Sequence, residues 1–96
     1  MEVAIARFVR HDGGGALKAF CDVMIGDHLL IKGIPVIEGR LGPFVSMPRQ
    51  QNKEGKWFDS VIPMTRGMKA ELTRVVMDAY RNSEVAAAAG EDSHII

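Results

Sequence analysis

The sequence predicts an α+β fold: a small antiparallel β-sheet of about four or five strands with one C-terminal helix packed on it. Before Pro63, apolar and polar residues alternate in short runs separated by glycine and proline turns, which is typical of half-buried strands. From Met68 onward the apolar residues recur at helical spacing instead. The 96 residues make one domain with a thin core, and domains of this size often gain stability by oligomerising.

The first two strands are expected over Glu2–Arg10 and Ala16–Ile25. The alternation of the first strand slips near Phe8, whereas the second places one clean apolar face toward a core. Residues 11–15 end in three glycines and are interpreted as a turn, since glycine reaches positive φ without steric cost. A phosphate-binding loop would need a helix directly after these glycines, and a strand follows.

The return strand is expected over Leu29–Glu38, after a turn at Gly26-Asp27. Pro35 interrupts this strand. Because proline cannot donate a hydrogen bond to the ladder, an edge position or a bulge is predicted there. A second subunit can pair at an open edge. The candidate dimer contacts are this segment and a later aromatic pair, namely Ile34, Pro35, Val36, Trp57 and Phe58.

The stretch from Gly42 to Pro63 contains the best candidate for a working surface. A short strand candidate, Phe44–Met47, is followed by a polar and mostly basic loop that runs from Arg49 to Lys56. Glu54-Gly55 is a candidate turn tip, so this loop is predicted to be a hairpin arm that ends at Trp57.

The C-terminal helix is expected to begin at Thr65, a residue type favoured at the N-cap. Its predicted core stripe consists of Met68, Leu72, Val75, Val76 and Ala79. On the solvent side, Glu71 with Arg74 and Arg74 with Asp78 are expected to form ion pairs. The helix is predicted to fade near Asn82, so residues 1–82 would form the domain and residues 83–96 a flexible tail.

The sequence shows no catalytic or metal-binding pattern. His11 and His28 lie in or beside turns, and Cys21 lies on the apolar face of a strand, as a structural thiol would. No HxxxH, CxxC or paired carboxylate pattern with metal spacing appears. We therefore predict no enzyme activity, no metal, no cofactor and no small-molecule ligand.

Location is predicted from equally simple features. No apolar run approaches the roughly 20 residues that span a bilayer, and the start lacks the features of a signal peptide. The single cysteine fits a reducing compartment. We expect a cytoplasmic protein without a membrane partner.

Positive charge gathers between residues 40 and 69 of a chain whose formal net charge is zero. In this stretch, only Glu54 and Asp59 oppose the cations Arg40, Arg49, Lys53, Lys56, Arg66 and Lys69, and acidic residues elsewhere in the chain balance the excess. Basic side chains beside an aromatic residue suit phosphates and stacked bases. Arg66 and Lys69 also stand where the positive end of the helix dipole favours an anion. A solvated loop with scattered charges remains the alternative.

Several short motifs resemble the stage V sporulation protein G (SpoVG) family, also called the septation regulators. They are Met1-Glu2-Val3, Leu17-Lys18-Ala19, Phe44-Val45-Ser46-Met47-Pro48, Gly55 with Phe58-Asp59, Pro63, and Ala79-Tyr80. The likeness runs from Met1 to about Tyr80. Its most specific part is the Phe-Val-x-Met-Pro segment and the spacing that follows it.

The resemblance implies an antiparallel sheet with a C-terminal helix, assembled as a homodimer. It also implies a site-specific nucleic-acid-binding protein that regulates gene expression, linked to sporulation and septum formation. Carried over by position, the candidates for contact with double-stranded DNA are Arg49, Lys53, Lys56, Arg66 and Lys69, and RNA is an alternative ligand. Glu71 departs from the family pattern, which has lysine there, and weakens the basic face of the helix. A protein-interaction module for cell division, without direct nucleic-acid binding, is the rival reading.

Overall fold

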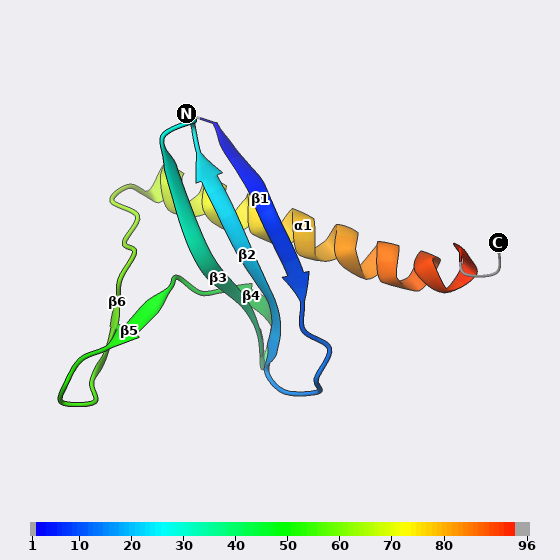
Figure 1. The fold of residues 1–96 in the computed structure, drawn as a ribbon, viewed down its shortest axis with the longest axis horizontal. Coiled ribbons are helices and arrows are strands. Elements are labelled where there is room, and N and C mark those ends of the chain that lie inside the picture. Colours follow the sequence, from blue (N-terminus) through cyan, green and yellow to red (C-terminus); the bar gives the residue numbers. More distant parts are fainter. Residues whose placement is uncertain (1, 94–96) are drawn as a thin grey trace.

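The computed structural model describes residues 2–93 and confirms the predicted α+β architecture. Its elements in chain order are β1 (Val3–Arg10), β2 (Leu17–Ile25), β3 (Leu29–Gly39), β4 (Gly42–Val45), β5 (Arg49–Gln51), β6 (Trp57–Asp59) and α1 (Arg66–Ser93). The first four strands form one antiparallel sheet in the order β1-β2-β3-β4, and β5 and β6 form a separate antiparallel hairpin. Figure 1 shows α1 crossing behind the sheet and the hairpin projecting to one side.

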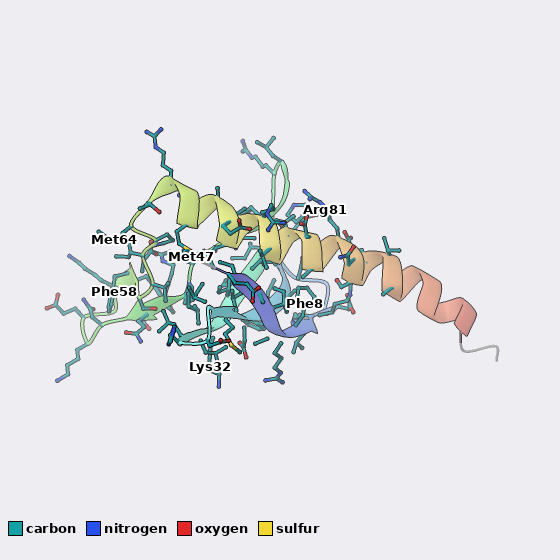
Figure 2. All side chains as sticks on the ribbon, turned by 90° about the horizontal axis from the view of Figure 1, so that it is seen from above. Phe8, Lys32, Met47, Phe58, Met64 and Arg81 are labelled. Carbon is teal, nitrogen blue, oxygen red and sulfur yellow. The ribbon has the colours of Figure 1, made fainter. Side chains whose placement is uncertain are left out.

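The core lies between α1 and one face of the sheet. The predicted apolar face of β2 is confirmed, since Ala19, Cys21 and Val23 are almost fully buried. On α1, Leu72 and Val76 are buried as expected. The helical stripe that faces the sheet differs from the predicted one, because Met77 and Tyr80 also belong to the core whereas Val75 and Ala79 are only half-buried. From the sheet, the core also contains Ile25, Ile34 and Val36. In Figure 2, Phe8 lies between the sheet and α1, whereas Lys32 lies on the opposite side of the sheet.

Two bulges account for the irregularities seen in the sequence. In β1 the register shifts between Ile5 and Arg7, which explains the slip in alternation. In β3 the shift lies between Ile31 and Ile34, and Gly33 adopts a φ of 75° there. The Gly33 amide donates a hydrogen bond to the Asp22 carboxylate at 2.9 Å, which holds the bulge in place.

Pro35 lies where the outer edge of β3 changes from paired to open. Strand β4 pairs with β3 only from Val36 to Gly39, and Ser46 N–H donates to the Pro35 carbonyl at 3.1 Å just beyond that ladder. Among the described residues, no backbone hydrogen bond covers the same edge of β3 from Leu29 to Ile34. The predicted bulge thus lies in β3 but at Lys32–Gly33, whereas Pro35 itself pairs with Phe20 and stands at the boundary of the open edge.

The start of α1 agrees with the sequence prediction and its end does not. The Thr65 hydroxyl accepts a hydrogen bond from Met68 N–H at 3.1 Å, so Thr65 is the N-cap. Arg74 pairs with Glu71 and, at 3.3 Å, with Asp78. The predicted end near Asn82 is wrong, because α1 continues to Ser93 through an alanine-rich segment of high helix propensity. Residues 94–96 of the predicted tail lie outside the described residues, and the tail's flexibility stays a prediction.

Within residues 2–93, no helix combines the length and the apolar character that crossing a bilayer requires.

We expect Leu72→Ala to lower the free energy of unfolding by about 3 kcal/mol, because it removes a fully buried side chain and leaves a cavity between α1 and the sheet. Leu41→Ala is the matched control, since Leu41 is fully exposed in the β3–β4 turn and its truncation should change stability by less than about 0.5 kcal/mol. Urea denaturation followed by circular dichroism measures both. Equal effects for the two variants would contradict the assigned core.

Candidate nucleic-acid interface

The β5–β6 hairpin presents Lys53 and Lys56 on a turn that its own hydrogen bonds hold in shape. The Asn52 side-chain oxygen accepts from the amides of Glu54 and Lys56, both at 2.9 Å, in the manner of an Asx turn. Gly55 takes a φ of 86°, so the predicted turn tip is confirmed. These hydrogen bonds order the backbone that carries the two lysines, and they do not involve the lysine ammonium groups.

The base of the hairpin is closed by contacts between its two ends. Ser60 N–H and its hydroxyl both donate to the Pro48 carbonyl, at 2.9 and 3.1 Å. Arg49 pairs with Asp59 across the strands at 3.2 Å, and both side chains are about half exposed. An exposed pair of this kind contributes little stability, so Arg49 can exchange Asp59 for another anion at low cost.

Arg66 and Lys69 are exposed in the first turn of α1, which contains no acidic residue. They line a shallow groove along the helix together with Thr73, Arg74 and Arg81. Arg74 and Arg81 are partly neutralised there by Asp78, at 3.3 and 3.6 Å. Within the described part of the chain, neither Arg66 nor Lys69 forms an ion pair, so their charges and the helix dipole act in the same direction.

The five predicted DNA-contacting cations lie toward one end of the molecule, in two groups. The hairpin carries Arg49, Lys53 and Lys56, and the start of α1 carries Arg66 and Lys69. Figures 1 and 2 both show the hairpin and the helix start away from the C-terminal end of α1, separated from each other by the connecting segment. No hairpin residue lines the groove at the helix start, so the hairpin cations and the helix cations do not form one continuous site within a single subunit.

The predicted dimer contacts fall into different environments. Ile34 and Val36 are fully buried beneath α1 in the core of their own chain, so their side chains are not available to a second copy. The alternation of β3 puts Pro35 on the other face, where it is half-buried. Trp57 and Phe58 are exposed, as an interface role requires.

The sequence analysis missed an apolar patch beside the start of α1. Leu29, Ile62 and Met64 are 58%, 65% and 87% exposed. They surround a cavity of about 210 Å³ that has no ionisable lining residue and opens next to Met68 and Leu72. The apolar residues flanking Pro63 were the available signal, and the sequence analysis assigned no surface to them.

Cys21 has the environment of a structural thiol. It is 1% exposed, and burial raises the pKa of its thiol to about 11, with a smaller contribution from the nearby Asp22 carboxylate. A nucleophilic cysteine needs the opposite conditions, namely a positive and partly open site.

The fold and these surfaces define a small α+β domain in which one helix backs a four-stranded sheet and cations stand on a projecting hairpin and a helix start. The chain belongs to the SpoVG family, whose model matches residues 1–82. The resemblance seen in the sequence is thereby confirmed.

Several proteins named "Putative septation protein SpoVG" are similar to the chain. The one from Archaeoglobus fulgidus is 31% identical over 86% of this chain and 98% of that protein. The one from Symbiobacterium thermophilum is 37% identical over 83% of this chain but only 57% of that longer protein. The first SpoVG of Listeria monocytogenes strain F2365 is 31% identical over 97% of this chain and 91% of its own length.

We expect the free energy of unfolding to fall as the pH rises from about 9 toward 11, in part because of Cys21. The thiol has an ordinary pKa of 9.0 and a folded pKa of about 11, so in this window the unfolded state binds fewer protons and gains stability relative to the native state. Urea denaturation at several pH values measures the slope. Cys21→Ala should flatten it, and an unchanged slope would show that the thiol is not protected in the native state.

Proposed function

We propose that this protein is a dimeric regulator of gene expression that binds double-stranded DNA, and that it acts in septation and sporulation. The observation that carries the proposal is the set of cations Lys53, Lys56, Arg66 and Lys69, which form no ion pair within residues 2–93 and lie toward one end of a domain whose formal net charge is zero. Charged side chains held free of partners on an ordered hairpin and a helix start suit the phosphate backbone. The names of the similar SpoVG proteins support the septation role.

Glu71, which stands where the family pattern has lysine, opposes the positive charge of the helix start less than the sequence suggested. Both Arg74 Nε and an Arg74 terminal nitrogen donate to the Glu71 carboxylate, so this negative charge is engaged on the helix itself. An approaching phosphate therefore meets Arg66 and Lys69 beside a neutralised pair. The positive end of the helix dipole adds to the attraction at the same place.

Dimerisation supports this function because one subunit offers only a few phosphate contacts. Two copies double the number of cations, and counterion release makes the affinity rise steeply with that number. The uncharged patch of Leu29, Ile62 and Met64 is the surface we assign to the second copy. Contiguous apolar surface of this kind marks an interaction site.

The salt dependence of duplex binding tests the DNA proposal. We expect log affinity to fall linearly with log salt concentration, and Lys53→Ala and Lys56→Ala each to lower the slope by about 1 with similar weakening on all sequences. Fluorescence anisotropy with labelled duplexes measures this. Lys69→Ala, on the helix, is expected to change the preferred sequence as well.

Arg40→Ala is the matched control, since it removes an exposed cation from the β3–β4 turn, away from both groups. If affinity does not change with salt, or if Arg40→Ala weakens binding as much as the hairpin variants do, this surface does not bind DNA. RNA of the same sequence in competition decides between the two nucleic acids.

Sedimentation equilibrium tests the dimer. We expect twice the chain mass of 10.5 kDa for the natural sequence, and a shift to monomer for Ile62→Asp, because the new charge would be buried in the apolar interface. Val85→Asp is the control, since Val85 is equally exposed but lies on the distant part of α1. A dimer that survives Ile62→Asp would place the interface elsewhere.

The same patch carries the second candidate function, a protein-interaction module in cell division. Its apolar lining would fit another protein as well as a second copy. Capture of septum proteins after nuclease treatment, together with no shift of any DNA, would favour this function over the first.

A further inference from the structure

The face of the sheet turned away from α1 carries an exposed aromatic side chain at its centre. Phe20 on β2 is 42% exposed and lies between Val9 of β1 and Pro35 of β3, its cross-strand neighbours. α1 packs on the opposite face, and Figure 1 shows the strands in front of α1. The phenyl ring is therefore supported from both sides while part of it stays in contact with solvent.

A groove runs from Phe20 to the hairpin. Two adjoining cavities of about 360 and 480 Å³ share Phe20, Lys32 and Gly33 as lining residues. The first extends to Arg7 on β1, and the second continues to Trp57 on β6, which is 59% exposed. The groove thus connects two aromatic side chains from separate sheets, with Lys32 between β2 and the hairpin.

The charges on this face are mostly positive. The strand alternation places Arg7, Lys18 and Lys32 here, and within residues 2–93 none of them forms an ion pair. Asp22 is the anion that lines the groove, and its carboxylate accepts the amide hydrogen of Gly33. An occupant of the groove is therefore expected to be anionic and to have flat apolar surfaces.

We propose that this groove binds single-stranded nucleic acid, with bases stacked on Phe20 and Trp57 and phosphates beside Arg7 and Lys32, while Lys18 adds positive charge on the same face of the sheet. Stacking on aromatic side chains along a positive groove is how proteins hold single strands without reading a fixed sequence. An open four-stranded sheet with aromatic residues on its surface is known to present such a platform. The groove adjoins the proposed duplex surface at Arg49, which lines its second cavity, but Phe20, Lys32 and Arg7 belong to the groove alone, so variants of these residues and of Lys53 test the two proposals separately.

A second copy of the chain is a poorer occupant of this face. A twofold interface would oppose identical patches and bring the same three cations together from both subunits. Like charges facing each other disfavour association, whereas the uncharged patch of Leu29, Ile62 and Met64 carries no such cost.

Trp57 supplies a direct optical test because it is the only tryptophan in the chain. We expect oligothymidylate of about 16 nucleotides to quench its fluorescence when a base stacks on the indole ring. The quenching should rise with oligonucleotide concentration along the same curve as binding measured by anisotropy. Phe20→Leu keeps an apolar side chain of similar size and should weaken binding about tenfold. Lys32→Gln should weaken it less and lower the salt slope by about 0.7.

Arg40→Gln and Lys53→Ala serve as controls, since both remove exposed cations that do not line the groove. They should leave oligothymidylate affinity within about twofold, because each removes at most one distant phosphate contact. Loss of duplex binding in Lys53→Ala with oligothymidylate binding intact would separate the two sites.

Three results would overturn the proposal. One is saturating binding without any change in Trp57 fluorescence, and another is equal affinity of the natural chain and Phe20→Leu. The third comes from Phe20→Glu: a fall from dimer to monomer in sedimentation would show that a second copy covers this face. An unchanged mass together with lost oligothymidylate binding would support the groove.

Discussion

The packing of a single helix against a single face of the sheet is the constraint on which the rest of the structure depends. Leu72 and Val76 close over Ala19, Val23 and Val36, and this contact removes the inner face of β2 and β3 from water. One helix cannot cover both faces of a four-stranded sheet. The outer face, the hairpin and the helix start are therefore left to solvent, and all the surfaces proposed for binding lie there.

Polar contacts at the edge of the sheet fix the direction in which α1 crosses it. The Arg10 guanidinium stands over the Tyr80 ring, 5.8 Å from its centroid, and donates to the Ser83 hydroxyl at 3.1 Å and to the Asp12 carboxylate at 2.9 Å. The Ser83 hydroxyl in turn donates to the Tyr80 carbonyl at 2.7 Å. These contacts tie β1 to the middle of α1 and so set where the helix start and its two cations lie relative to the sheet.

Features encoded in neighbouring residues were predictable, and features set by distant ones were not. The face of β2, the Thr65 cap and the hairpin turn at Gly55 follow from short-range patterns. The sequence could not show that β3 turns the side chains of Ile34 and Val36 into the core of their own chain, and the interface role given to these residues stays a prediction. Likewise, sequence spacing could not show that the hairpin and helix cations form two groups, nor that Phe20 and Trp57 line one groove.

The short length of β4 has a consequence for solubility. Among residues 2–93, it leaves the outer edge of β3 without backbone partners from Leu29 to Ile34, and such an edge can recruit strands from other molecules without limit. The chain limits this aggregation hazard through the lysine at position 32, the bulge at Gly33 and the missing amide hydrogen of Pro35. The irregularities that make β3 a poor strand therefore protect the protein from open-ended fibre growth.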